Sequence, residues 1–281
     1  ATVQDDGGLS ITTPMATVAV NVSDGGLELS KGAVISATGD RGSDSAYGEG
    51  MAEEYSIGDM TNIQIHTPAG LLPLNTVVKI GYAPNTSGGS NRSVNTAGGA
   101  STGGFTAAAD TGAVFSATGQ TANMGSDMTQ YQVKAEPIDG LTAGASYTTY
   151  DMDDSAAGQS PEAGSWYAKY AVGPVTAAYG RAYIAVATAS IAATYETVKN
   201  SKMGASYAVN DDLNFSYAVE KSEATHMLNT TADVEMEVQQ IAAAYTMGGM
   251  TLAVSQNSYD NSNYTLNKDA KSTVFNLSMA F

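Results

Sequence analysis

The residue types that support catalysis or metal binding are scarce and scattered in this sequence. The two histidines, His66 and His226, have no Asp or Glu at metal-ligand spacing, and isolated histidines of this kind are more often pore or surface residues than metal ligands. Asp and Ser are so abundant that a Ser/His/Asp set can always be assembled on paper, which is no evidence for a catalytic triad. There is no Cys, and hence neither a thiolate metal site nor a disulfide framework. We therefore predict no enzyme, no catalytic residue and no bound cofactor.

Charged side chains offer the remaining chemistry, which is electrostatic. Asp and Glu number 28 against 12 Lys and Arg, and the net charge of −16 argues against nucleic-acid binding, because phosphate contacts need clustered cations. One acidic group lies in residues 23–60 and comprises Asp40, Asp44, Glu49, Glu53 and Glu54. A second group, Asp151, Asp153 and Asp154, has oxygen ligands of the kind that Ca²⁺ prefers, although a plain solvated loop is the more common role of such a group.

The elements that carry these charges are strands. Thirty Gly and 16 Tyr, with many Thr, Ser, Asn and Val, are typical of strands and turns and predict an all-β class. In the last segment Phe275, Leu277, Met279 and Phe281 share one face, while Asn276 and its alternate neighbours share the other, the period of two expected of a strand. No uncharged apolar stretch reaches the roughly 20 residues that a membrane-spanning helix needs.

The connections between strands alternate in length. Short turns rich in Gly, Asn, Asp and Pro lie at residues 5–9, 68–74, 139–141, 173–175, 210–213 and 248–250. Long polar segments lie at residues 23–60, 84–127, 151–163, 221–233 and 260–269. Short turns at one end and long loops at the other are the layout of an antiparallel transmembrane β-barrel. The twelve predicted strands are residues 14–22, 61–67, 75–83, 128–137, 141–151, 164–172, 174–182, 195–209, 212–220, 234–247, 250–259 and 270–281, and residues 112–118 could add a strand inside the second long loop.

Strand alternation turns the scarce cations to one face. In the strand predicted at residues 75–83, Val78 and Ile80 lie on the apolar face, so Lys79 lies on the polar one. The same alternation places three further lysines on polar faces: Lys134, Lys169 and Lys202. A charge that faces lipid near the bilayer midplane costs about 2–4 kcal/mol, so this placement favours a barrel with a polar interior.

Three runs in the second half of the chain carry a family resemblance. They are VFNLSMAF at 274–281, IAAAYT at 241–246 before a Gly-Gly pair, and SYAVNDDL at 206–213. With these runs the chain resembles the general diffusion porins of Gram-negative outer membranes, especially those of alphaproteobacteria. The resemblance implies a sixteen-stranded homotrimer in contact with outer-membrane lipid and lipopolysaccharide. Apart from the resemblance, divalent ions at the loop carboxylates Asp151, Asp153 and Asp154 could bridge the protein to lipopolysaccharide.

The resemblance also implies the activity and the residues that control it. The activity is passive diffusion of small hydrophilic solutes and ions through a water-filled channel. Residues 23–60 are expected to form a loop that folds into the lumen and narrows it. The acids of this loop would then face a basic wall made of Lys79, Lys134, Lys169 and Lys202. Such a transverse field acts on charged and dipolar solutes.

The position of the inward loop predicts that the front of the barrel is absent from this chain. In the porins that the chain resembles, the inward loop follows the fifth strand, whereas residues 23–60 follow the first complete strand here. The twelve predicted strands then match the fifth to the sixteenth. We therefore expect an N-terminally incomplete porin without its signal peptide, with a closed twelve-stranded barrel as the competing interpretation.

The main alternative is a secreted or surface β-rich structural protein of the adhesin kind, since high acidity and abundant Thr, Gly and Asn suit such proteins too. A β-sandwich, however, tolerates turns of similar length at both ends. The alternating loop lengths and the terminal Phe281 favour the barrel. For a barrel enzyme, the sequence marks neither a nucleophile nor an acid–base pair. A substrate-specific channel differs from a general one mainly in details of the lumen, and this alternative stays open.

Overall fold

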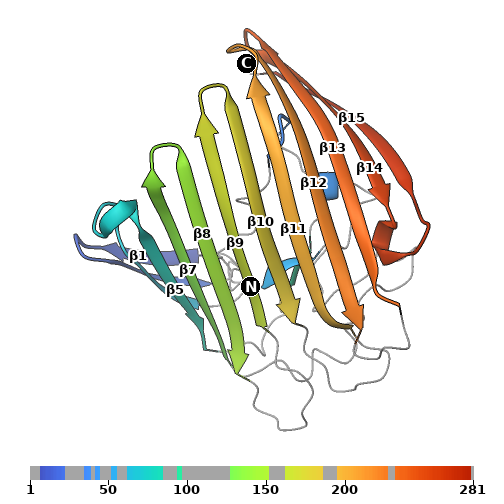
Figure 1. The fold of residues 1–281 in the computed structure, drawn as a ribbon. Helices are drawn as coiled ribbons and strands as arrows, with labels where there is room; N and C mark the ends of the chain where they lie inside the picture. Colours follow the sequence, from blue (N-terminus) through green and yellow to red (C-terminus); the bar gives the residue numbers. More distant parts are fainter. Residues whose placement is uncertain are drawn as a thin grey trace, which may run out of the picture.

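The computed structural model describes residues 7–22, 35–38, 42–44, 52–55, 62–84, 94–96, 127–151, 162–185, 195–226 and 232–279. They form one sheet of thirteen antiparallel strands and a separate two-stranded sheet (Figure 1). The large sheet consists of β1 (Gly7–Thr12), β2 (Thr17–Val22), β4 (Asn62–His66), β5 (Val77–Ala83), β7 (Asp127–Ile138), β8 (Leu141–Asp151), β9 (Glu162–Val172), β10 (Val175–Ala185), β11 (Tyr195–Ala208), β12 (Leu213–His226), β13 (Val234–Met247), β14 (Met250–Asp260) and β15 (Ala270–Met279). The small sheet pairs β3 (Ala52–Tyr55) with β6 (Val94–Thr96), and 3-10 turns lie at η2 (Gly42–Asp44), η3 (Pro73–Asn75) and η5 (Ser262–Tyr264).

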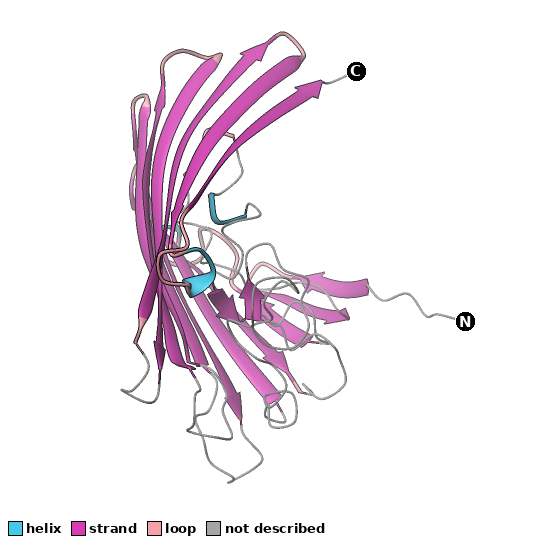
Figure 2. Ribbon diagram, turned by 90° about the vertical axis from the view of Figure 1, so that its right-hand side faces the viewer, coloured by secondary structure: helices cyan, strands magenta, loops and turns pink. Residues whose placement is uncertain are grey.

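The large sheet curves around a concave side, which holds the small sheet and η2 (Figure 2). Strands follow one another in chain order across it, so β1 and β15 are its two edges. Among the described residues no pairing joins these edges, and the sheet has thirteen strands, one more than the twelve-stranded barrel considered from the sequence. From β7 to β15 the strands have 10 to 14 residues. A tilted strand needs about 9–11 residues to cross the hydrocarbon layer of a membrane. No helix in the described parts of the chain is long and apolar enough to cross a membrane.

All twelve strands predicted from alternation are present, and a thirteenth precedes them. Residues 5–9 were expected to be a turn because of their Asp-Asp-Gly-Gly composition, but β1 already begins at Gly7. Leu9 and Ile11 pair across from Val20 and Val18, so matched apolar residues on one face outweigh the turn propensity of the glycines. The turn lies at residues 13–16 instead, where Thr13 N donates to the Ala16 carbonyl over 2.9 Å.

The strands also extend further toward the long loops than predicted. Residues 221–233 were expected to be a loop, yet β12 continues to His226. The charged residues that suggested a loop lie on the outward face of the strand, where Lys221 pairs with Glu235 and Glu237. Because Lys221 is paired with two carboxylates on the neighbouring strand, β12 accommodates these charges without ending in a loop. The strand considered at residues 112–118 lies outside the described residues.

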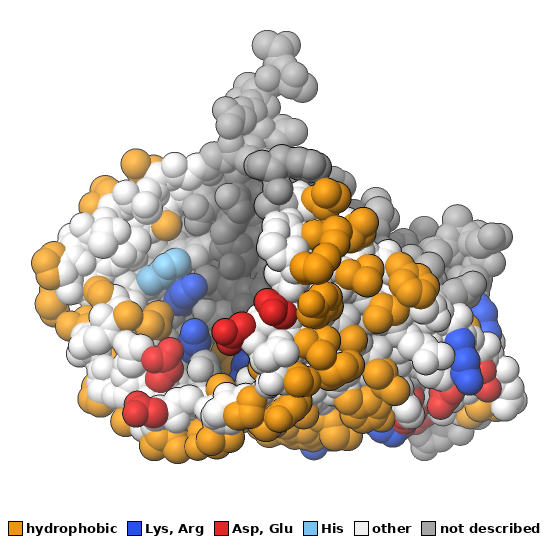
Figure 3. All heavy atoms as spheres, turned by 90° about the horizontal axis from the view of Figure 1, so that it is seen from above, with side chains coloured by type: hydrophobic (Ala, Val, Ile, Leu, Met, Phe, Trp, Pro, Cys, Tyr) orange, Lys and Arg blue, Asp and Glu red, His pale blue; other side chains and the backbone are white. Residues whose placement is uncertain are grey.

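The two faces of the sheet differ as strand alternation predicted. The outward face exposes large apolar side chains, among them Tyr131, Trp166, Ile241 and Phe275, the last with 74% of its surface accessible. The concave face carries polar residues instead: Asn62, Gln64, Gln130, Gln132, Ser146, Thr148, Ser165, Asn200, Ser216, Gln240 and Asn257, all buried. Figure 3, viewed from the end with the short turns, shows charged side chains around a central hollow and hydrophobic ones along the outer rim.

The short turns keep neighbouring strands in register. In the turn between β7 and β8, Gly140 has a φ of +78°, a left-handed conformation that costs glycine little. A Cβ at this position would lie 2.2 Å from the carbonyl oxygen of Ala171, so the glycine also permits a close approach to the end of β9. The Ala171 amide donates to the Gly140 carbonyl over 2.9 Å and ties this turn to the next hairpin.

Candidate constriction site

A buried ion pair lies on the concave face, where β11 and β12 run side by side. Strand alternation points both Lys202 of β11 and Glu220 of β12 inward, and the two residues are direct register partners. Lys202 Nζ lies 3.7 Å from Glu220 Oε2, and each side chain is only 4% exposed. A charged pair removed from water in this way is costly unless further polar groups satisfy it.

The 3-10 turn η2 supplies such groups to the carboxylate. Ser43, which is fully buried, donates its backbone N–H to Glu220 Oε1 over 3.3 Å. Its hydroxyl lies 3.0 Å from Oε1 and 2.9 Å from Oε2 of the same carboxylate, so the one hydroxyl proton is shared between the two oxygens. Glu220 therefore pairs with Lys202 of the sheet and also accepts hydrogen bonds from Ser43 of η2, which is 177 residues away in the chain.

A second contact fixes η2 against β13 and β14. Tyr259 of β14 donates its hydroxyl to the Gly42 carbonyl over 3.0 Å, and this tyrosine is fully buried. A Cβ at position 42 would lie only 2.8 Å from Val238 Cγ1. Glycine is thus required here because the backbone of the turn packs directly on the wall.

The stretch that precedes η2 contacts the same wall. Ala37 donates its N–H to the Ser216 hydroxyl of β12 over 2.7 Å. Ile35 is buried, and its Cβ is 3.4 Å from the position that a Cβ on Gly204 of β11 would take. Residues 35–38 and 42–44, which we call the docked segment, therefore lie on the concave face of β11 to β14.

The small sheet covers the neighbouring part of the concave face. β3 belongs to the same long connection as the docked segment, and it contacts β9, β10 and β11. Its partner strand β6 comes from the second long connection. Two connections that are separate in the sequence are thereby joined on the inner side of the large sheet.

The acids predicted in residues 23–60 are only partly within the described structure. Asp40 and Glu49 lie outside the described residues. Asp44 ends η2, and Glu53 and Glu54 lie in β3, where the structure describes their backbone. The backbone of these three positions lies on the concave side of the sheet, and their role in narrowing a lumen stays a prediction.

The four predicted lysines divide into two sets. Lys79, Lys134 and Lys169 lie on the concave face near the short turns, and Lys202 lies in the buried pair with Glu220. Lys79 is paired in register with Gln132, two residues from Lys134, so these two lysines are diagonal neighbours on adjacent strands. Lys169 is opposite Thr142 on β8. We call the first three residues the lysine patch.

Polar partners surround the lysine patch. His66 is the register partner of Lys79, and one of its ring nitrogens lies 2.7 Å from Gln64 Oε1. Glu136 is an exposed acid on the same face, and it accepts a hydrogen bond from Asn75 Nδ2 over 2.7 Å. Among the described residues, the lysine patch therefore sets three lysines beside one acid, Glu136, although the chain as a whole has a net charge of −16.

Sequence reasoning missed the residues that hold the docked segment. Alternation in the strand predicted at residues 212–220 puts Glu220 on the face opposite to Phe215 and Tyr217, but no role was predicted for Glu220, Ser43 or Tyr259. The available signal for Glu220 was its position: it lies on the polar face of its strand, across from Lys202 on the polar face of the preceding strand, which indicates an ion pair. The described residues contain no group of three or more His, Asp or Glu arranged to hold a metal ion. Of the acids considered for Ca²⁺, Asp153 and Asp154 lie outside the described residues, so that expectation stays a prediction.

No protein-family model matches the chain, and no curated protein matches it. Solved structures do. OmpF of Salmonella typhi, in a complex with daunomycin, matches with a TM-score of 0.57 and 14% identity over 97% of this chain and 88% of its own. The anion-selective porin of Comamonas acidovorans matches with a TM-score of 0.51 and 14% identity over 93% of this chain and 69% of its own.

An outer membrane protein of Vibrio cholerae, in-vitro folded OmpT in its trimer form, matches with a TM-score of 0.51 and 12% identity, over 96% of this chain and 77% of its own. Identities this low establish the fold alone. The agreement extends over nearly the whole chain in each of these matches. The chain is all-β and has the porin-like fold, that of the antiparallel β-barrels of outer membranes.

Proposed function

We propose that this chain is an outer-membrane porin, which forms a water-filled channel for the passive diffusion of small hydrophilic solutes and ions. The observation that carries the proposal is the docked segment, which is held by Ser43 and Gly42 against the polar face of the sheet. A segment fixed on the inner wall narrows a channel without closing it, and its position is set by hydrogen bonds rather than by a core of its own.

The contrast between the two faces supports a membrane setting. Trp166, Tyr217 and Ile241 are each at least 46% exposed on the outward face. In water such a face would be a large apolar patch that drives association. In a bilayer the same face is solvated by lipid, and the polar concave face then lines an aqueous lumen. This contrast disfavours the alternative of a secreted or surface β-rich structural protein.

The lysine patch suggests how the channel treats charge. Lys79, Lys134 and Lys169 raise the local concentration of anions along one side of the lumen, near the short turns. We propose that the acids of residues 23–60, including Asp40 and Glu49, face the opposite side and complete a transverse field. The anion selectivity of the Comamonas acidovorans porin is compatible with a patch of this kind. Kinship with alphaproteobacterial porins and a homotrimer in the outer membrane are part of the same proposal.

Reconstitution into a planar lipid bilayer tests the proposal. The purified chain should insert from detergent and produce stepwise increases in current, each step being one channel or one trimer. Replacing Lys79, Lys134 and Lys169 together by Gln should shift the zero-current potential in a salt gradient toward cation preference. A chain that stays soluble and monomeric without detergent and produces no current steps would disprove the proposed function.

A further inference from the structure

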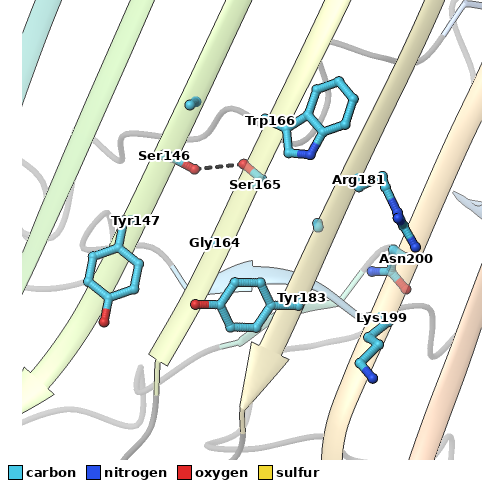
Figure 4. A pocket seen from close by; sticks show the side chains of 11 residues that line it. Ser146, Tyr147, Gly164, Ser165, Trp166, Arg181, Tyr183, Lys199 and Asn200 are labelled. Atoms are coloured by element: carbon cyan, nitrogen blue, oxygen red, sulfur yellow. Dashed lines mark hydrogen bonds between the residues drawn. The ribbon is translucent and has the colours of Figure 1, made fainter.

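An aromatic groove lies on the outward face of β8 to β11, near the long loops. Its volume is about 500 Å³, and its lining includes Tyr147, Trp166 and Tyr183 (Figure 4). Gly164 of β9 lies between the two tyrosines, because it is the register partner of Tyr147 on one side and of Tyr183 on the other. A side chain at position 164 would fill the groove: its Cβ would lie 2.6 Å from Cε1 of the Tyr183 ring.

The tyrosine hydroxyls are held at the loop end of this groove. Tyr147 donates to Glu162 Oε2 over 2.7 Å, and Tyr183 donates to Oε1 of the same carboxylate over 3.3 Å. The two rings are thus fixed as walls, and Glu162 is occupied by their hydroxyls. The Trp166 ring packs at a tilt against the Tyr179 ring, with ring centroids 5.6 Å apart. Trp166 thereby extends the aromatic lining from Gly164 toward the short-turn end of β9.

Two cations border the groove on the β10 and β11 side. Arg181 is the register partner of Trp166, and Lys199 is the register partner of Tyr183. Both are exposed, and within the part of the chain that the structure describes neither makes an ion pair or a hydrogen bond. Lys199 is also opposite Glu223 of β12, the acid closest to it in register.

The next outward cation is different. Lys221 of β12 is the register partner of Ser201, at the same level as Arg181, but it is neutralised by Glu235 at 3.1 Å and Glu237 at 2.6 Å. The outward face thus carries one lysine with two carboxylates and, beside it, two cations next to an aromatic groove. Arg181 and Lys199 can therefore bind an anion, whereas the charge of Lys221 is already balanced by two carboxylates.

We propose that this groove binds a phosphorylated lipid of the surrounding membrane. The phosphate lies between Arg181 and Lys199, and an acyl chain lies against Trp166 and the small side chain of Ala145. Cations hold a phosphate by charge-assisted hydrogen bonds, and basic pockets on membrane proteins bind anionic head groups in this way. A free phosphate would contact only the two cations, whereas a lipid would also contact the aromatic lining through its acyl chain. The inference rests on the proposed function, because the groove meets lipid only if the outward face lies in a membrane.

Native mass spectrometry of the folded, detergent-solubilised chain tests this site. The probes are phosphatidic acid, diacylglycerol with the same acyl chains, and inorganic phosphate. We expect phosphatidic acid to be retained at one molecule per chain and diacylglycerol to be retained about tenfold less. The double variant Arg181→Gln/Lys199→Gln should lower retention of phosphatidic acid about tenfold or more, and Lys221→Gln, the matched control, should leave it within about twofold.

Several results would overturn the proposal. One is equal loss of phosphatidic acid in the double variant and in Lys221→Gln, and another is equal retention of diacylglycerol. Displacement of the lipid by millimolar inorganic phosphate would make the site one for a free anion. A change in oligomeric state with unchanged lipid retention would make the groove a contact between copies. Channel currents recorded on the same samples separate the two hypotheses: currents without lipid retention refute only the lipid site, and absent currents in the parent chain refute the proposed function.

Discussion

Removal of the Glu220 carboxylate should destabilise the barrel wall more than any other single change at the docked segment. Glu220→Ala takes away the carboxylate 3.7 Å from Lys202 and the acceptor of the Ser43 N–H and hydroxyl. Both charged side chains are 4% exposed, so water does not replace the lost partner. Breaking a buried ion pair by removing one partner costs about 3–5 kcal/mol in free energy of unfolding.

Two further variants separate the charge from the hydrogen bonds. Ser43→Ala keeps the ion pair and removes one hydrogen bond to a charged group, which costs about 1.5–3 kcal/mol. The double variant Lys202→Met/Glu220→Ala removes both charges, so it leaves no unpaired lysine charge in the buried site. This double variant should therefore be more stable than Glu220→Ala alone, by about 1–3 kcal/mol.

Reversible urea unfolding in detergent micelles measures these differences, with the fluorescence of Trp166, the single tryptophan of the chain, as the probe. In a bilayer, Glu220→Ala should also increase the noise of the open-channel current, because the docked segment loses an anchor. The reasoning fails if Glu220→Ala unfolds within about 0.5 kcal/mol of the parent chain, or if the double variant is no more stable than the single one.

Three further results are expected. Gly42→Val should alter single-channel conductance, because a Cβ at position 42 would lie 2.8 Å from Val238 Cγ1 and push the docked segment off the wall; unchanged conductance would contradict this packing. Lys134→Glu should shift the zero-current potential toward cation preference, and an unshifted value would show that the lysine patch does not act on permeating ions. Ile241→Lys on the outward face should cost about 2–4 kcal/mol in urea unfolding, whereas Ser258→Lys, nearer the loops on the same face, should cost about 0–1 kcal/mol; equal costs would contradict the lipid-facing assignment.

The strands and their faces were predictable because their signal is local. A period of two over eight to ten residues places Lys79, Lys134 and Lys169 on the concave face without knowledge of any partner. The exception is β1, where Gly7 and Gly8 favour a turn in isolation but pair with the apolar β2 in the sheet. Propensity is a weak prior at such positions, because cross-strand contacts contribute as much as the local preference.

The docked segment was predictable only in outline. The length and acidity of residues 23–60 suggested a loop that folds inward, but nothing periodic marks Ser43 or Gly42 as the residues that touch the wall. Their partners, Glu220 and Tyr259, lie 177 and 217 residues away in the chain. Such contacts depend on the curvature of the whole sheet, which no single segment encodes.

The sequence by itself determined the class of the protein: its strands, the side of each strand that is polar, and the alternation of turns with loops. These follow from the backbone period and from turn chemistry, which act over a few residues. Only the tertiary structure decided which charges meet. It paired Lys202 with Glu220 beneath η2, gathered the lysine patch on the concave face, and set Arg181 and Lys199 beside an aromatic groove. The reason is that a charge has no intrinsic partner: strand register and sheet curvature bring distant groups within a few ångströms, where electrostatic interactions become strong.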